Sequence, residues 1–139
     1  MSDNVPDWLI HSGRALVILA PRHLRTSERV GSEIREQNQY EMMLARLQRL
    51  RGSVYLEDGA ITEADLTPDG RHLSPVDERA WHVLAVEAGG HVRGCARYLA
   101  HDPDVSFTDL VIRNSALAQN LDWRGKLRRA VEADVALAS

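Results

Sequence analysis

The chain lacks the features that mark several protein classes. It holds one cysteine, Cys95, so no internal disulfide can form, which suits a reducing compartment. Lysine occurs once, as Lys126, and the other basic residues are arginine, a bias typical of a GC-rich bacterial genome. No apolar run approaches the ~20 residues of a spanning helix, and no basic leader of a signal peptide is present. We therefore expect a soluble, cytoplasmic bacterial protein without a membrane span.

Common catalytic and binding motifs are also missing. The six histidines form no HExxH pattern or close pair, so we expect no metal site. There is no phosphate-binding GxxxxGK[ST] loop, no GxGxxG and no GxSxG. The formal net charge of −3 disfavours wholesale binding to nucleic acid. We expect Cys95 to be a buried, unreactive thiol.

The composition predicts a single domain over residues 1–139. Of the 139 residues, 44% are hydrophobic and 27% charged, which allows a buried core without disulfides. Residues 1–14, with Pro6 and Gly13, are predicted to form a loose lead-in.

Hydrophobic spacing predicts a strand followed by a long helix. The run Ala15–Ala20, closed by Pro21, is typical of a buried strand. The helix is predicted to begin at an N-cap, Ser32, and to end at Gly52. Its apolar stripe consists of Tyr40, Met43, Leu44, Leu47 and Leu50.

An acidic loop and a hairpin are predicted next. From Glu57 to Glu78 there are seven acids against one base, among turn dipeptides. The stretches His82–Glu87 and His91–Leu99 flank a glycine turn, which predicts an antiparallel hairpin. Gly94 interrupts the second strand, as expected for a bulge. Strict alternation groups its flanking side chains into two faces: Val92, Ala96 and Tyr98 on one, and Arg93, Cys95 and Arg97 on the other.

The remaining residues predict a further strand, Phe107–Ile112, and a last helix that begins near Asp122. The order of strand, helix, loop, three strands and helix predicts an α+β fold with a mainly antiparallel sheet flanked by helices.

The first turn of the last helix is a candidate anion site. Arg124 and Lys126 lie where cations oppose the helix dipole. Free backbone N–H groups reinforced by cations suit a phosphate. The alternative is a solvated basic helix end, partly neutralised by an i,i+4 pair of Arg128 with Glu132.

The hairpin, the strand Phe107–Ile112 and the helix from Trp123 resemble the N-terminal and central parts of the GCN5-related N-acetyltransferase (GNAT) fold. In that family, the loop after the fourth strand binds the pyrophosphate of acyl-CoA through a glycine-containing pattern. The segment Arg124-Gly-Lys matches that pattern but lacks its second glycine. The resemblance implies cofactor contacts at Leu110, Val111 and Ile112, whose backbone would polarise the thioester, and at Arg124, Gly125 and Lys126.

Residues 30–139 are more closely similar to the acyl-homoserine-lactone synthase and N-acyl amino acid synthase branch. The resemblance rests on Arg51-Gly-Ser-Val-Tyr55, on the acids Asp58, Asp65 and Asp69, and on Gly94-Cys-Ala-Arg97. It implies an N-acyltransferase that moves an acyl group from acyl-CoA or acyl carrier protein to a small amine such as an amino acid.

The implied site contains an acid as base and an arginine for the acceptor. The candidate bases are Glu57, Asp58, Asp65 and Asp69, and the sequence does not choose among them. Arg97, with Tyr98 beside it, would bind an acceptor carboxylate; the alternative is an ion pair of Arg97 with a loop acid such as Asp69.

The family's fold continues beyond the helix at which this chain ends. We therefore expect a fragment truncated after the pyrophosphate-loop helix, a chain completed by a second one, or a non-catalytic GNAT-like module that binds a ligand or partner. An uncovered sheet edge favours a homodimer.

Overall fold

The computed structural model describes residues 13–24, 33–34, 36–102 and 104–137. The chain divides into two compact units, Met1–Leu99 and Ala100–Ser139. Residues 1–12 of the predicted lead-in, and Ser32, lie outside the described residues. Within the described part of the chain, no helix is long and apolar enough to cross a membrane.

The first unit contains a three-stranded antiparallel sheet, so the predicted α+β class is confirmed. β1 (Arg14–Leu19) pairs with β2 (Trp81–Glu87), which pairs with β3 (His91–Tyr98). The first predicted strand and the predicted hairpin are both present. Gly89 and Gly90 in the hairpin turn have φ angles of 84° and 79°, a left-handed conformation that glycine adopts without strain.

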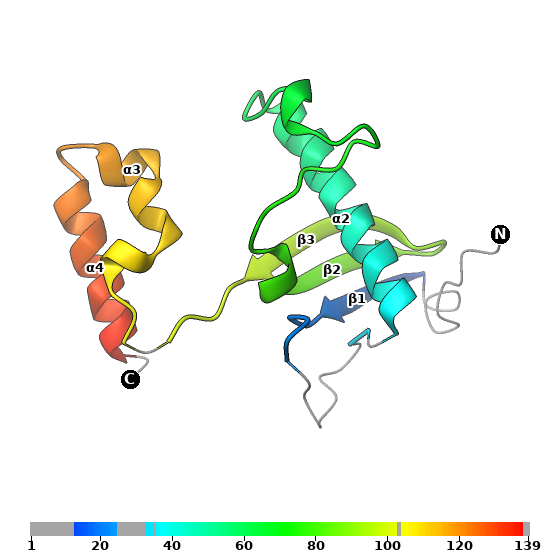
Figure 1. The fold of residues 1–139 in the computed structure, drawn as a ribbon, viewed down its shortest axis with the longest axis horizontal. Helices are drawn as coiled ribbons and strands as arrows, with labels where there is room; N and C mark the ends of the chain where they lie inside the picture. Colours follow the sequence, from blue (N-terminus) through cyan, green and yellow to red (C-terminus); the bar gives the residue numbers. More distant parts are fainter. Residues whose placement is uncertain (1–12, 25–32, 35, 103, 138–139) are drawn as a thin grey trace. The chain divides into compact units, whose positions relative to one another are not determined.

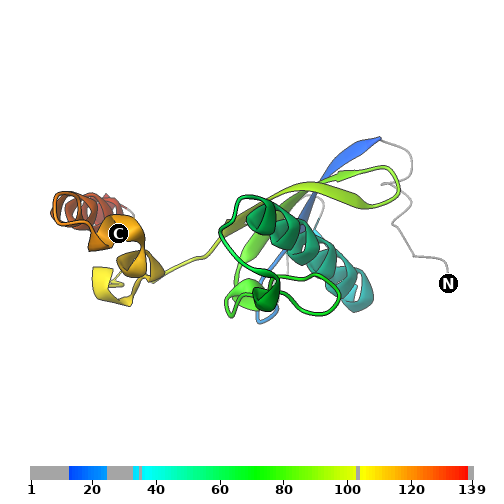
Figure 2. The same ribbon diagram turned by 90° about the horizontal axis from the view of Figure 1, so that it is seen from above.

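α2 (Gln37–Glu57) crosses one face of this sheet (Figures 1 and 2). The helix begins later than the sequence predicts, because the backbone N–H of Ile34 donates to Ile18 O in β1 at 3.0 Å. Glu36 caps the helix instead, and its carboxylate accepts from the N–H groups of Asn38 and Gln39 at 3.0 and 2.7 Å. The predicted stripe is buried at Tyr40, Met43, Leu44 and Leu47, which pack on Val17, Leu19, Leu84 and Val86 of the sheet.

Gly52 does not end α2 as predicted. The helix continues to Glu57 and closes with a Schellman motif, in which Gly59 N donates to Leu56 O and Ala60 N to Tyr55 O, at 3.1 and 2.9 Å. Gly59, with a φ of 72°, is therefore the terminating glycine. Gly52 instead lies against the returning acidic loop, where an added Cβ would come within 2.7 Å of Gly70 O.

β3 contains a bulge that changes which side chains share a face. Ala85 pairs with Gly94 and Val86 with Val92, so Arg93 is the extra residue. Val92 consequently lies on the α2 face with Cys95 and Arg97, and the grouping of Val92 with Ala96 and Tyr98 is wrong. The prediction of a buried Cys95 is also wrong, since its side chain is exposed.

Among its described residues, the second unit contains helices and turns but no strand. Phe107–Ile112 is not a strand, as predicted, but forms parts of two 3-10 turns, Phe107–Asp109 and Val111–Asn114. Ser106 Oγ donates to Asp109 Oδ2 at 2.7 Å, a local hydrogen bond that competes with strand formation. The turns are followed by α3 (Ala116–Gln119) and by α4 (Arg124–Leu137), close to the predicted last helix.

Replacing Gly52 with alanine is expected to destabilise the protein although alanine favours helix. The added methyl group would displace the loop at Gly70 and His72, at a cost of about 1–3 kcal/mol, against a gain in helix propensity of about 1 kcal/mol. Urea denaturation measures the difference. The matched control is Ser53→Ala at the next, exposed position, and equal or greater stability of Gly52→Ala would contradict the close approach.

Candidate functional site

The centre of the candidate site is the carboxylate of Asp77, which lies in a 3-10 turn (Asp77–Arg79) directly before β2. Its side chain is only 3% exposed. Arg51, on the buried side of α2, binds it with two parallel hydrogen bonds, from Nη1 to Oδ1 at 2.9 Å and from Nη2 to Oδ2 at 2.7 Å. This fork is the strongest geometry available to a carboxylate and a guanidinium.

Three further donors complete the surroundings of Asp77. Gln48 Nε2 and the backbone N–H of Ser74 donate to Oδ2 at 3.0 and 3.2 Å, and Arg97 Nη1 donates to Oδ1 at 3.3 Å. Burial raises the pKa of the Asp77 carboxyl, but the hydrogen bonds from Arg51 and Gln48 outweigh it and bring the pKa below its usual value. Asp77 is therefore ionised and serves as a fixed anion.

Two histidines contact this cluster. His72 Nδ1 accepts from Arg51 Nε at 3.2 Å, so that nitrogen carries no proton. His82, which is 1% exposed, has Nε2 2.8 Å from the backbone oxygen of Asp77. Burial is the main cause that lowers the pKa of His82, because the charged imidazolium is poorly solvated there.

Arg97, at the carboxyl end of β3, is the accessible member of the cluster. Its Nη1 donates to Ser74 Oγ at 3.0 Å and to Asp77, while the side chain remains 41% exposed. Nε and Nη2 have no acceptor among the described residues. Two guanidinium groups thus share one buried carboxylate, which leaves a local excess of positive charge with free N–H donors. The alternative expected from the sequence, a pair with a loop acid, is correct in kind, but the acid is Asp77 rather than Asp69.

The candidate bases lie elsewhere in the first unit. Asp65 accepts from Thr62 N and Oγ1 at 2.8 and 2.9 Å, and these hydrogen bonds lower its pKa. Asp69 accepts from Thr67, Arg71 and Arg49, which lower its pKa far more. Both carboxylates hold the loop in place and are poor proton acceptors. Glu57 and Asp58 are exposed at the end of α2, with no hydrogen bond to the Asp77 cluster.

Arg97 and Tyr98 do not share a site surface. Arg97 pairs with His82 and lies on the α2 face, whereas Tyr98 pairs with Trp81, lies on the opposite face and is 65% exposed.

The second unit holds the residues expected to bind the cofactor. Arg124, Gly125 and Lys126 are exposed at the start of α4, and Lys126 Nζ lies 4.5 Å from the centroid of the Trp123 ring. Within the described part of the chain, the backbone N–H groups of Gly125 and Lys126 have no acceptor. Leu110 is buried and Ile112 is exposed, so these two do not form a continuous surface.

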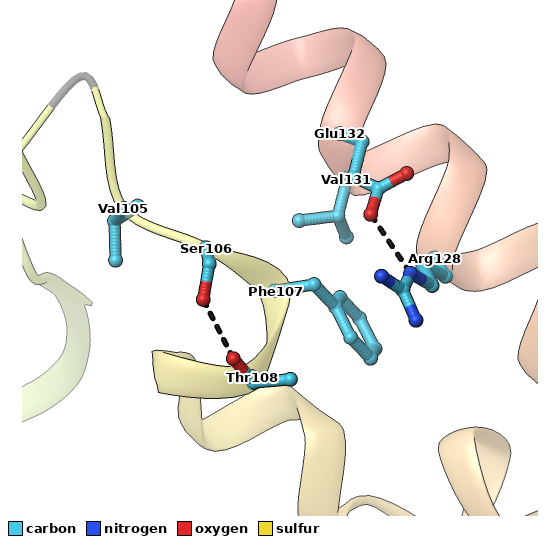
Figure 3. Close-up of a pocket in the computed structure, with 7 residues that line it drawn as sticks. All are labelled: Val105, Ser106, Phe107, Thr108, Arg128, Val131 and Glu132. Carbon is cyan, nitrogen blue, oxygen red and sulfur yellow. Dashed lines mark hydrogen bonds and ion pairs between the residues drawn. The ribbon is translucent and has the colours of Figure 1, made fainter.

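A small pocket lies further along α4 (Figure 3). Its volume of about 160 Å³ is below the roughly 300 Å³ typical of small-molecule sites. It is lined by Val105, Ser106, Phe107, Thr108, Arg128, Val131 and Glu132. Arg128 Nε donates to Glu132 at 2.8 Å, which confirms the predicted i,i+4 pair and neutralises the pocket's one cation. Neither Arg124 nor Lys126 lines it.

Asp77, Gln48 and the two histidines were not singled out from the sequence, and Arg51 was named only as part of the motif Arg51-Gly-Ser-Val-Tyr55, without a role in the site. A signal was present, because Arg51 continues the apolar stripe one turn beyond Leu47. A charged residue at a core position predicts a buried partner. No group of three or more metal-ligating side chains occurs in the part of the chain that the structure describes. Comparison with family models, curated proteins and solved structures finds no match.

We expect Asp77→Asn to destabilise the protein by about 3–5 kcal/mol, because Arg51 would remain buried without a counter-charge. Urea denaturation at neutral pH measures this loss. Asp69→Asn removes an exposed carboxylate from the same loop and should cost much less. Equal losses in the two variants would contradict the central role of Asp77.

Stability is expected to fall as the pH is lowered from about 7 to about 5. The pKa of His82 is lowered in the folded state, so the unfolded chain binds more protons in this window. Above its usual pKa of 6.5, neutral His82 makes its full contribution to the stability of the fold. This contribution is lost as the pH falls from there through the lowered pKa of the folded state. Urea denaturation across this range gives the free energy of unfolding at each pH. That free energy should change less with pH in His82→Gln than in the exposed control His101→Gln. An unchanged slope in His82→Gln would contradict this assignment.

Proposed function

We propose that this chain carries the first part of a GNAT-type N-acyltransferase that transfers an acyl group from acyl-CoA or acyl carrier protein to a small, carboxylate-bearing amine. The observation that carries the proposal is that two of the motifs on which the resemblance rests meet at one acid of the loop between them. Arg51 from the helix motif and Arg97 from the Gly-x-x-Arg motif both bind Asp77 of the acidic loop. Segments far apart in the sequence therefore form one charged cluster.

The order of the elements gives further support. A strand, a long helix, an acidic loop and a hairpin produce the sheet order β1-β2-β3, with α2 on one face. The resemblance implies the same succession of helix, acidic loop and hairpin. The fourth strand is absent at Phe107–Ile112, so we do not assign polarisation of the thioester to Leu110, Val111 or Ile112.

In the proposed reaction, Arg97 holds the acceptor. Its Nη1 is fixed by Ser74 and Asp77, and the remaining N–H groups would donate to the acceptor carboxylate. The amine nitrogen attacks the thioester carbon, an amide C–N bond forms and the C–S bond breaks. A base takes the amine proton, and the thiolate leaves and is protonated. Glu57 and Asp58 remain the candidate bases, because hydrogen bonds commit Asp65 and Asp69 to the loop.

The start of α4 is the proposed phosphate site for the donor. Exposed Arg124 and Lys126, with the free N–H groups of Gly125 and Lys126, provide donors and positive charge for a pyrophosphate. The alternative function is a non-catalytic module of the same type, favoured by the engagement of two candidate bases in structural hydrogen bonds. Such a module would bind the donor without turnover.

Coenzyme A and long-chain acyl-CoA are expected to stabilise the full chain, by about 2.7 kcal/mol at 100 times Kd. Arg124→Ala should weaken binding about 10-fold or more, since it removes a charge-assisted hydrogen bond. Thermal shift and calorimetric titration measure both effects, with Arg113→Ala in the same unit as the control.

Turnover is tested by release of the free thiol in a Cys95→Ser background, with amino acids and the matching amines that lack the carboxylate as acceptors. Arg97→Ala should raise KM for the amino acids alone. Binding without thiol release would favour the non-catalytic module. No stabilisation by coenzyme A, acyl-CoA or acylated carrier protein would contradict both readings.

A further inference from the structure

The outer edge of β3 pairs with no strand in the part of the chain that the structure describes. β3 pairs only with β2, and its backbone makes no other hydrogen bond to a described residue. By contrast, the outer edge of β1 is partly occupied, because Ile18 O accepts from Ile34 N at 3.0 Å. The last four residues of β3, Cys95–Tyr98, are all exposed. The part of this edge beyond the bulge, Gly94–Tyr98, contains neither proline nor lysine and is a template for another strand.

The sheet face opposite α2 is also apolar. Leu16 in β1 is 63% exposed, Val83 in β2 is 39% exposed and Tyr98 in β3 is 65% exposed. They share one face by the observed register, in which Leu16 lies opposite Ala85, and Val83 lies between Ile18 and Ala96. The apolar surface reaches the open edge at Ala96 and Tyr98, so a strand added there would extend it.

We propose that β3 pairs antiparallel with β3 of a second copy of this chain, with Ala96 opposite Ala96 and Tyr98 opposite Gly94, which joins two three-stranded sheets into one of six strands. The proposal goes beyond acyl transfer and does not rest on it. The second copy would occupy the place where the resemblance expects a fourth strand.

The side chains of β3 disfavour the two neighbouring registers. Two residues that lie directly opposite each other in an antiparallel pair point to the same face of the sheet. When the two strands are identical, the two-fold symmetry axis therefore passes beside one residue, which lies opposite its own copy. An axis at Arg97 would place like charges directly opposite each other. An axis at Cys95 would oppose Tyr98 to Val92, which the bulge has moved to the other face. The axis at Ala96 pairs residues 94–98 and ends before the bulge.

Gly94 and Tyr98 complement each other in this register. Among the described residues, a Cβ at Gly94 would have only Ala85 Cβ within 4 Å, at 3.8 Å, so nothing described covers the glycine. An aromatic ring from the adjoining strand covers a glycine of this kind. The arginines are compatible, because each Arg97 already binds Asp77 of its own chain and would lie opposite Cys95 of the other.

The register predicts a specific cross-link. In a Cys95→Ser background, Ala96→Cys would place two thiols on directly opposed residues, whose Cα atoms lie about 4.5–5.5 Å apart, within the range of a disulfide. We expect mild oxidation to give a disulfide-linked dimer on a non-reducing gel. The matched control is Ala60→Cys in the same background, a position that is also exposed but lies after α2. Cross-linking of Ala96→Cys no greater than that of Ala60→Cys would overturn the proposal.

Mass in solution provides a second measurement that needs no new cysteine. Light scattering of the wild-type chain should give twice the 15.6 kDa of one copy. Tyr98→Lys should give the monomer mass, since a charge would lie over the glycine of the other chain. A monomeric wild type at about 100 µM, a concentration that would populate even a micromolar dimer, would overturn the dimer. It would leave the acyltransferase proposal intact, because donor binding is measured separately.

Discussion

The first unit depends on one buried carboxylate. Asp77 is bound by Arg51 of α2 and Arg97 of β3, and its own backbone oxygen contacts His82 of β2. Contacts to Asp77 thus join the helix, the acidic loop and the sheet. Such a buried ion pair contributes little net stability, because desolvation offsets the attraction. Its effect is to specify position: the loop can close against α2 only where Asp77 meets both arginines.

This constraint gives the two sides of the sheet different chemistry. On the α2 face, core packing gives way at the end of β3 to a charged cluster with a half-exposed arginine. On the other face, exposed apolar residues continue to the edge of β3, which pairs with no other described strand. Arg97 and Tyr98 are neighbours in the chain, but alternation along the strand assigns them to different surfaces. One surface suits an anionic ligand, and the other suits a second strand.

The sequence predictions were correct where hydrophobic spacing decides the structure and wrong where specific contacts decide it. The strand near Ala15, the hairpin and the apolar stripe of α2 were predicted because hydrophobic spacing reports directly on burial. Phe107–Ile112 was predicted as a strand because it contains an apolar run, whereas Ser106 and Asp109 form local hydrogen bonds that favour a turn. Gly52 was interpreted as a terminator, although its lack of a side chain serves a close contact with Gly70.

The sequence by itself therefore determined which residues form the three strands and which side of α2 packs on them. Only the tertiary structure decided the partner of each charge. Arg51 and Arg97 lie 26 and 20 positions from Asp77, and nothing in their spacing favours it over the six other acids of the loop. Burial made that choice, because a carboxylate removed from water must bind every donor within reach, whereas its exposed neighbours remain solvated.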